Sequence, residues 1–363
     1  MDQVGIPFWF MRGGTSRGPY LRRQDLPENR DQLARILVAM VGSGHKFNID
    51  GIGGGVAVTT KVAMLSQADD DWADVDYFFA QVSVDDRTVD FKPTCGNILV
   101  GVGPAAIEMG MIPVQGDVTD VRIRAVNTGA KVLARVQTPD GAVAYAGDAR
   151  IDGVPGTAAP VELQFMDTVG GSTGALFPTG NRKDVVDGVE VSCMDVAMPM
   201  VMARAGSFGV TGYETVEELD ANQELMKRME AVRIAAGQLM GMGDVSKSVT
   251  PKFGLFAPAR EGGAATVRYF MPWNCHPTLA VTGSQCMAAC LLSPGTVAEG
   301  LHASNDAGPA TLALEHPVGK LYVSMIYERQ GSDISIQSAG LTRTARKLAS
   351  GNVFVPGNLM QEA

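Results

Sequence analysis

The stretch Pro93-Thr94-Cys95-Gly96-Asn97 opens an apolar segment that continues almost without interruption to Met109. A weaker copy, Val281-Thr282-Gly283-Ser284, opens a second apolar segment half a chain length downstream. Segments that are apolar nearly all round predict helices enclosed by protein rather than helices on a surface. One copy begins with a thiol and the other with a hydroxyl group. The pair therefore predicts a duplicated chain with a single asymmetric site.

Other segments repeat in the same order at a nearly constant offset. Residues 60–65 are similar to residues 251–256, and residues 75–79 are similar to residues 266–270. Similarity over half a chain indicates duplication rather than a solenoid, whose repeats are much shorter. The alternative is that apolar patterning alone makes these strands look alike. We predict two α/β halves that divide in the polar segment 181–188, giving domains 1–184 and 185–363.

Three helical regions can be placed along the chain. Residues 32–41 carry apolar side chains at helical spacing, namely Leu33, Ile36, Leu37 and Met40. Residues 95–109 predict the first enclosed helix, and Pro104 predicts a kink or a shortened first part because proline lacks a backbone N–H. Residues 215–240, rich in charged side chains, predict a solvated helix pair.

Composition limits the classes of protein. A length of 363 residues suits two domains, and 45% hydrophobic residues can build their cores. The net charge of −9 disfavours a nucleic-acid partner, which needs a cationic surface. Prolines interrupt the longest uncharged stretch, residues 271–298, so we expect no membrane span. Five cysteines without a C-x-x-C pair, behind an N-terminus that lacks a secretory signal, predict reduced thiols in the cytoplasm.

Cys95, Gly96 and Asn97 combine properties of a reactive site. The start of a helix presents unpaired backbone N–H groups, which stabilise a thiolate and also receive carboxylates. Gly96 lets a ligand approach the backbone closely. The alternative for Cys95 is a buried thiol that packs as a small hydrophobic side chain. The polar start of the helix argues for function.

Lys61 lies in a strand-like run, residues 56–65, after the glycine-rich stretch 50–55. A lysine there is either an exposed surface residue, which is the commoner case, or a desolvated base that carries a proton. The glycines before it and the neighbouring hydroxyl groups of Thr59 and Thr60 argue for the base.

The third candidate is the loop at residues 11–18, which reads Met-Arg-Gly-Gly-Thr-Ser-Arg-Gly. Its glycines, hydroxyl groups and two arginines suit an anion, and a carboxylate in particular. The loop lacks the Gly-Lys-Ser/Thr ending of a Walker A motif and the G-x-G-x-x-G pattern of dinucleotide-binding proteins. A plain turn between two strands is the alternative.

Metal and hydrolase chemistry find no support in the sequence. The four histidines, His45, His276, His302 and His316, are widely separated and show no metal-ligand spacing. The pair Cys275-His276 is more typical of packing or substrate contact. One G-x-S-x-G match occurs, at residues 170–174, but Pro178 and Gly180 follow it where a nucleophile elbow needs a helix, so it does not indicate a hydrolase. The remaining residues suit proton transfer, so we expect neither a metal nor an organic cofactor.

At these motifs the chain resembles the cofactor-independent isomerases grouped with 2-methylaconitate isomerase and 4-oxalomesaconate tautomerase. More distantly, it is similar to proteins with the diaminopimelate epimerase fold. The resemblance covers essentially the whole chain, and it is closest to the tautomerase branch. The matching segments are residues 11–16, 50–54, 60–63, 95–104, 147–156 and 209–214.

The resemblance implies two pseudo-symmetric α/β domains of the diaminopimelate epimerase type, each a barrel-like sheet around a central helix. It implies an active site in the cleft between them, and it allows the last strand to return to the first domain. It assigns proton transfer to Lys61 and Cys95. The residues that it implies for substrate binding are Arg12, Gly13, Gly14, Thr15, Ser16, Thr60, Gly96, Asn97, His276, Thr282, Gly283 and Ser284.

The resulting hypothesis is a 1,3-allylic proton shift, or the equivalent keto–enol tautomerisation, in an unsaturated tricarboxylate such as 4-oxalomesaconate. One of Lys61 and Cys95 removes a proton, and the other, or the same residue, returns one at the distant carbon. A 2-methylaconitate or aconitate isomerase is the first alternative.

Two further alternatives belong to other classes. A two-thiol epimerase needs cysteines at both helix starts, and Thr282 in the second copy disfavours it. A non-catalytic carboxylate-binding protein would have no need of a thiol and a lysine at the site. The oligomeric state stays open between a monomer and a homodimer.

Overall fold

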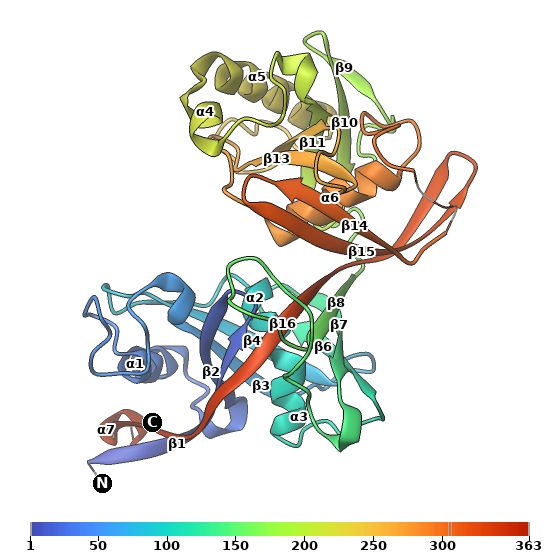
Figure 1. Cartoon of the computed structure of the whole chain (residues 1–363). Coiled ribbons are helices and arrows are strands. Elements are labelled where there is room, and N and C mark those ends of the chain that lie inside the picture. The colour runs from blue at the N-terminus through green and yellow to red at the C-terminus, as the bar shows by residue number, and fades with distance from the viewer. Residues whose placement is uncertain (1, 304, 306, 362–363) are drawn as a thin grey trace. The chain divides into compact units, whose positions relative to one another are not determined.

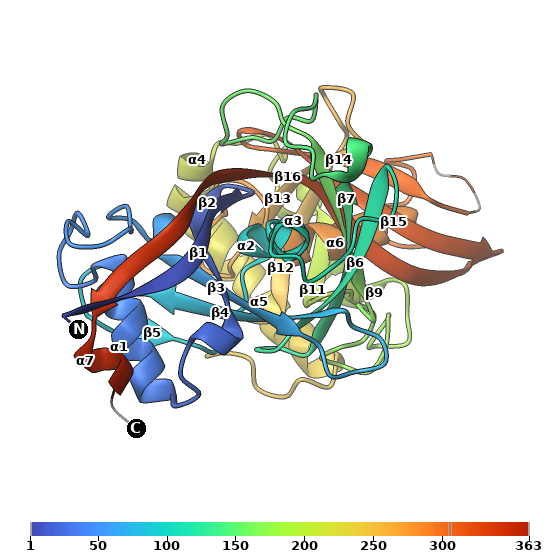
Figure 2. The same ribbon diagram turned by 90° about the horizontal axis from the view of Figure 1, so that it is seen from below.

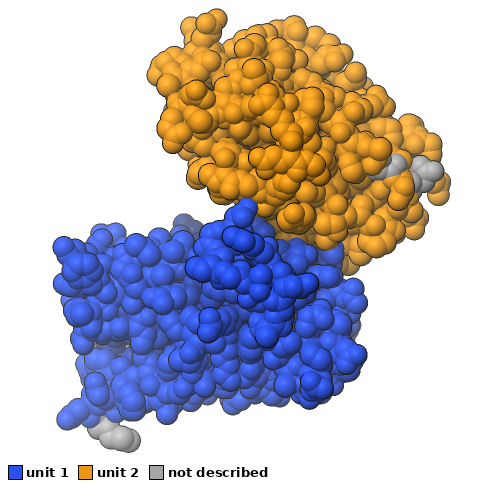
Figure 3. All heavy atoms as spheres, viewed as in Figure 1, with its two compact units in different colours: residues 1–164, 342–363 blue, residues 165–341 orange. Residues whose placement is uncertain are grey.

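The computed structural model describes residues 2–303, 305 and 307–361, which belong to two compact units (Figure 1). Unit 1 consists of residues 1–164 and 342–363, and unit 2 of residues 165–341 (Figure 3). The boundary expected at 184/185 falls inside unit 2. The segment before it belongs to unit 2 because the Asp195 carboxylate accepts hydrogen bonds from the backbone N–H groups of Ser172 and Thr173, both at 2.8 Å.

Unit 1 contains β1 to β8, the end of the last strand, β16, and four α-helices. The bounds are β1 (Gln3–Gly13), β2 (Ser16–Arg22), α1 (Arg30–Val41), β3 (Lys61–Gln67), β4 (Val75–Val82), β5 (Val89–Asp90), α2 (Gly96–Val100), α3 (Val102–Glu108), β6 (Val118–Ala125), β7 (Ala130–Gln137), β8 (Pro160–Met166), β16 (Asp333–Pro356) and α7 (Asn358–Gln361). Hydrogen-bonded neighbours follow the order β1-β2-β3-β4-β6-β7-β8-β16, and β16 also pairs with β1. The strand order of unit 1 is therefore closed, as in a barrel.

The barrel of unit 1 encloses α2 and α3 (Figure 2). The helix α2 contacts β1, β2 and β3, and α3 contacts β3, β6 and β7. The chain leaves α2 at Gly101 and enters α3 one residue later. Pro104 explains this interruption, because its nitrogen has no hydrogen to donate to the carbonyl oxygen of Val100. The predicted shortening of the enclosed helix is confirmed.

The helix α1 covers the outer face of the barrel. It begins at Asn29, whose side chain accepts hydrogen bonds from the N–H groups of Asp31 and Gln32, and it ends at Gly42 with φ 78°. Its predicted apolar face is buried, and it packs with Val62 and Met64 of β3 in one hydrophobic cluster. The helix predicted from residues 32–41 is confirmed.

Unit 2 follows the strand order β9-β10-β11-β12-β13-β14-β15-β16. The bounds are β9 (Asp184–Val186), β10 (Val189–Asp195), β11 (Pro199–Arg204), α4 (Val216–Ala221), α5 (Gln223–Leu239), β12 (Lys252–Ala257), β13 (Ala265–Phe270), α6 (Val281–Leu292), β14 (Ala310–His316) and β15 (Gly319–Gln330). Every residue of α6 from Gly283 to Leu292 is buried, and the helix contacts β10, β11, β14 and β15. The second enclosed helix is thus present as predicted.

The helix pair predicted from residues 215–240 is also present, as α4 and α5. It is less solvated than expected, because Leu225, Met229, Val232 and Ala236 of α5 are buried in a core of unit 2. Among the helices that the structure describes, none combines the length and the apolar character that a membrane crossing requires.

The packing of the barrel in unit 1 can be tested by substitution of one glycine, Gly18. A Cβ atom on Gly18 of β2 would lie 1.7 Å from the backbone carbonyl oxygen of Lys61 on β3. We expect Gly18→Ala to lower the free energy of unfolding by about 1–3 kcal/mol, because overpacking forces the strands to shift. Urea unfolding followed by circular dichroism measures this change.

Gly351→Ala is the matched control. Gly351 also lies in a strand of unit 1, and a Cβ atom there would meet no heavy atom within 4 Å. We expect its free energy of unfolding to stay within about 0.5 kcal/mol of the parent protein. Equal losses in the two variants would contradict the packing argument.

Candidate active site

Cys95 lies immediately before the central helix of unit 1. Its backbone is extended, with φ −132° and ψ 109°, and Gly96 is the first helical residue. The Cys95 side chain is partly exposed. The thiol therefore occupies the predicted place at the start of the enclosed helix.

Two tyrosines hold the backbone around this thiol. The Tyr77 hydroxyl donates to the Cys95 carbonyl oxygen at 3.3 Å, and the Tyr20 hydroxyl donates to the Ile98 carbonyl oxygen at 2.5 Å. Both tyrosines are fully buried, and burial raises the pKa of each well above 10. They are therefore neutral donors at neutral pH. The sequence interpretation missed both, since nothing in the local pattern shows which carbonyl a strand residue will reach.

Lys61 is the first residue of β3 and is partly exposed. Its Nζ atom donates to the Gln81 Oε1 atom at 2.6 Å and lies 5.4 Å from the centre of the Phe79 ring. The Gln81 Nε2 atom in turn donates to the Ala57 carbonyl at 3.1 Å and to the Thr60 hydroxyl at 3.2 Å. Gln81 is thus fixed by its own hydrogen bonds and orients the lysine. Gln81 is a third residue that the sequence did not predict.

Cys95 and Lys61 contact the same row of side chains on β4. Tyr77, Phe79 and Gln81 alternate along the strand and therefore point to one face of the sheet. Tyr77 bonds to the Cys95 carbonyl, the Phe79 ring lies beneath the Lys61 ammonium, and the two rings are 6.3 Å apart between centroids. The structure therefore brings the two predicted proton-transfer residues to one face of β4.

The turn between β1 and β2 lies against the start of α2. The Asn97 Nδ2 atom donates to the Thr15 hydroxyl at 3.1 Å, and the Thr15 N–H contacts the Asn97 Oδ1 atom at 3.5 Å. Gly14 has φ +51°, and a Cβ atom on it would lie 2.1 Å from Asn97 Oδ1. A Cβ atom on Gly13 would lie 2.3 Å from the Asn97 carbonyl oxygen. Both glycines are needed for this approach.

Ser16 and Thr60, both predicted to bind substrate, differ in their hydrogen bonds. Both side chains are buried. The Thr60 hydroxyl donates to the Val82 carbonyl oxygen at 2.7 Å. The Ser16 hydroxyl oxygen is buried without a hydrogen-bond partner, and Ser16 lines a cavity of 160 Å³ together with Thr15, Thr59, Arg12 and Arg17. Ser16 is therefore the hydroxyl group with unused capacity for a ligand.

Arg12 points to the other face of β1. Because Gly13 faces the central helix, the alternation of a strand places the Arg12 side chain outside the barrel wall. Its Nη1 atom donates to the carbonyl oxygens of Gly14 and Thr344, both at 2.8 Å. The Arg12 side chain thus links the β1–β2 turn to β16 through hydrogen bonds to a backbone carbonyl oxygen of each.

Two of the four predicted residues of unit 2, His276 and Gly283, lie against Tyr269. A Cβ atom on Gly283 would lie 2.2 Å from the Tyr269 ring, and the His276 ring meets that ring edge-on at 5.9 Å. The Thr282 hydroxyl contacts Met198 Sδ at 3.5 Å, and the Ser284 hydroxyl donates to the Val281 carbonyl oxygen at 2.7 Å. Burial lowers the pKa of His276, whose Nδ1 atom accepts from the Thr278 N–H. The imidazole is therefore neutral at pH 7.

The second helix start differs from the first in its register. Cys95 precedes α2, whereas Thr282 is the second residue of α6, which begins after Ala280. The thiol and the hydroxyl group therefore do not occupy the same helical position. Among the residues that the structure describes, no group of three His, Cys, Asp or Glu side chains is arranged to hold a metal ion.

Comparisons with known proteins agree over the whole chain. The PrpF protein family matches residues 3–356. A protein of Escherichia coli, YbhH, is 50% identical over 351 residues, which cover 97% of this chain and 99% of that protein. A 4-oxalomesaconate tautomerase of Pseudomonas putida is 46% identical over 355 residues, covering 98% of this chain and 97% of that protein. The crystal structure of a methylitaconate-delta-isomerase superposes with a TM-score of 0.91 at 31% identity, and it covers 100% of this chain and 98% of its own. With its barrel, its enclosed helix and these relatives, the chain belongs to the PrpF family.

Proposed function

We propose that this chain is an isomerase that moves a proton along an allylic system in an unsaturated polycarboxylate, with 4-oxalomesaconate as the first candidate. The observation that carries the proposal is the contact of Cys95 and Lys61 with one row of side chains on β4. An acid and a base beside one surface are what a proton shift needs. The 46% identity to a 4-oxalomesaconate tautomerase supports the choice of substrate.

The proposed reaction needs only proton transfer. One of Lys61 and Cys95 removes the proton from the carbon next to the conjugated system, and the electrons of that C–H bond move into the conjugated carbonyl or carboxylate. The double bond shifts, and the second residue, or the first one again, delivers a proton to the distant carbon. The charge of the dienolate forms beside the Lys61 ammonium, which stabilises it electrostatically.

The turn and the helix start supply the proposed carboxylate contacts in unit 1. The unpartnered Ser16 hydroxyl, the Thr15 hydroxyl and the backbone at Gly96 and Asn97 can donate to a carboxylate. Arg12 supports this surface indirectly, through the Gly14 carbonyl. For unit 2 we keep the proposal that His276, Thr282, Gly283 and Ser284 bind substrate carboxylates.

The five cysteines differ in a way that supports Cys95 as the reactive thiol. Cys95 is partly exposed, and the other four are buried. Burial raises the pKa of Cys193, Cys275 and Cys290 to about 12, and it raises that of Cys286 well above 9. A raised pKa keeps a thiol protonated at pH 8, and only the thiolate is a nucleophile.

The reaction is tested by isotope exchange. The protein is incubated in D2O with 4-oxalomesaconate, methylaconitate, methylitaconate and aconitate, and NMR follows deuterium incorporation and double-bond position. We expect exchange with at least one of them, and kcat about 10²–10⁴-fold lower in Cys95→Ser and Lys61→Met. Tight binding with no exchange in any of them would favour a carboxylate-binding protein. Full activity in both variants would contradict the assignment of proton transfer to Cys95 and Lys61.

The orienting role of Gln81 is tested separately. Gln81→Leu removes the acceptor of the Lys61 hydrogen bond, so we expect kcat to fall about tenfold while KM stays within about twofold. Gln67→Leu, an exposed position on β3, is the matched control and should leave both constants unchanged. An equal effect of the two variants on kcat would show that Gln81 does not position the lysine.

Alkylation tests the thiol assignment without a substrate. We expect iodoacetamide at pH 8 to add one group rapidly to the folded protein, at Cys95, with the four buried thiols reacting only after unfolding in urea. Peptide mass spectrometry identifies the modified residue, and Cys95→Ser should take up no rapid adduct. Rapid modification of Cys286 or of two cysteines at once is the result that would refute this prediction.

A further inference from the structure

Three arginines lie side by side on neighbouring strands of unit 1. Arg12 of β1 is paired with Arg17 of β2 and with Arg346 of β16 in the two antiparallel registers. Residues directly opposite each other in antiparallel strands point to the same face of the sheet. This arginine row therefore lies on the outer face of the barrel, opposite the face that Gly13 turns to the central helix.

The arginine row places like charges together without a compensating acid. Burial and the charge of Arg346 lower the pKa of Arg12, and like charges directly opposite destabilise a strand pair. Within the described part of the chain, none of the three guanidinium groups has a carboxylate partner. Other arginines of the same barrel are paired, since Arg122 meets Asp74 and Arg124 meets Asp76, at 2.6 and 2.7 Å. The row is not neutralised in this way, and it shares this property with Arg22 of β2, whose guanidinium donates to the Met109 carbonyl oxygen.

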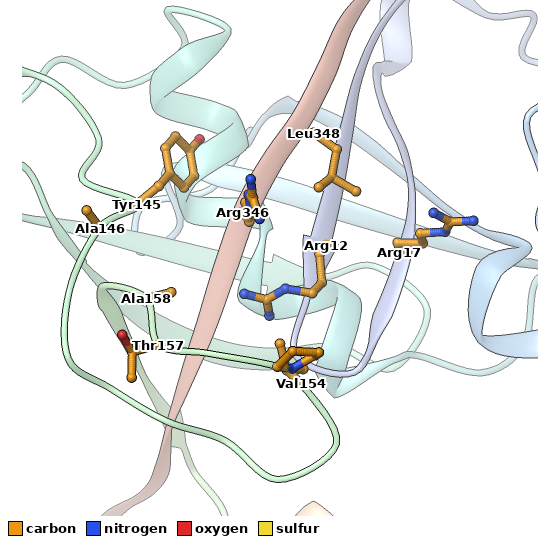
Figure 4. Close-up of a pocket in the computed structure, with 10 residues that line it drawn as sticks. Arg12, Arg17, Tyr145, Ala146, Val154, Thr157, Ala158, Arg346 and Leu348 are labelled. Atoms are coloured by element: carbon orange, nitrogen blue, oxygen red, sulfur yellow. The ribbon is translucent and has the colours of Figure 1, made fainter.

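A cavity of 590 Å³ lies over the row (Figure 4). Figure 4 shows Arg12 and Arg346 beside each other, with Tyr145 and Thr157 of the loop before β8 across from them, and with Arg17 extending away to the rim. Apolar side chains complete the wall, namely Ala146, Val154, Pro155, Ala158 and Leu348. The cavity therefore combines cationic groups with a surface for a carbon skeleton.

We propose that this cavity is an anion site, separate from Cys95 and Lys61, for a small organic acid with two or three carboxylate groups. A guanidinium group binds a carboxylate through parallel N–H donors, and two adjacent guanidinium groups can each take one carboxylate of the same molecule. The Arg12 Nη1 atom is used by backbone carbonyls, which leaves its other donors for the ligand. The apolar wall favours a polycarboxylate over inorganic phosphate.

The site adjoins the proposed catalytic turn. The 160 Å³ cavity at Ser16 shares Arg12, Arg17, Val154 and Pro155 with it, and two contacts connect the turn to its wall. Arg12 holds the Gly14 carbonyl at 2.8 Å, and a Cβ atom on Gly153, in the loop beside Val154, would lie 3.1 Å from the Thr15 methyl group. An acid bound by Arg12 and Arg346 relieves the repulsion between their guanidinium groups. Arg346 lines the 590 Å³ cavity and not the cavity at Ser16, so its substitution distinguishes binding at the two places.

The test maps both sites in one protein with one probe. Tricarballylate, a saturated tricarboxylate that cannot undergo an allylic shift, is titrated while phenylglyoxal modifies arginines and iodoacetamide modifies Cys95. Peptide mass spectrometry then measures the extent of modification at each arginine and at Cys95. We expect tricarballylate to protect Arg12 and Arg346, and equal concentrations of inorganic phosphate or acetate to protect neither. Arg135, an exposed arginine of β7, is the internal control and should stay unprotected.

Arg346→Gln separates the two sites. We expect the tricarballylate concentration that half-protects Arg12 to rise about tenfold in this variant, while the concentration that half-protects Cys95 is unchanged. Arg17→Gln, at the rim, is a second variant with the same expected direction, and Arg135→Gln is the charge-matched control that should shift neither.

Three results would overturn the proposal. The first is that tricarballylate protects neither Arg12 nor Arg346, and the second is that phosphate protects them equally well. The third is that Arg346→Gln raises the half-protecting concentration for Arg12 and for Cys95 by the same factor, which would indicate one shared site. None of these readings uses isomerase activity. A protein that fails to exchange deuterium but shows arginine protection would lose its proposed function and keep this site.

Discussion

Two buried phenol groups fix the start of the helix that the barrel of unit 1 encloses. A buried hydroxyl group without a partner costs about 1–3 kcal/mol, and the Tyr77 and Tyr20 hydroxyls find acceptors in the carbonyls of Cys95 and Ile98, which also accept the N–H groups of Leu99 and Gly101. The same two bonds fix the backbone that carries the thiol. The stability of the enclosed helix and the position of the proposed reactive group therefore depend on one pair of interactions.

The strand β4 organises the rest of the site. Its inward side chains present a hydroxyl to the thiol segment, an aromatic face to the Lys61 ammonium and an amide that orients it. Because these three side chains stand on a strand rather than on a loop, the geometry that they impose depends little on loop motion. The turn with Gly13 and Gly14 adds hydroxyl groups to the same surface, because no side chain on either glycine blocks its approach to Asn97.

Local patterns predicted the features that depend on local physics. The periodicity of residues 32–41, the break before Pro104 and the two enclosed apolar helices follow from side-chain spacing and from one missing N–H group, and all are present. The family resemblance predicted the barrel class, which is confirmed. Tyr20, Tyr77 and Gln81 could not be found this way, because their partners are distant in the sequence. Arg12 points to the outside of the barrel because its neighbour Gly13 faces the central helix. The composition of the loop alone does not reveal which of the two residues faces inward.

The pairing of β1 with β16 joins residues 3–13 to residues 345–356. During synthesis the first strand leaves the ribosome early, while its partner is made only after all of unit 2. The edge of β1 that faces β16 therefore has no partner for most of translation, and the barrel of unit 1 cannot close until then. Unit 2, residues 165–341, is continuous in sequence and is complete earlier. The order of maturation is thus the reverse of the order of the two units, although domains near the N-terminus generally fold first.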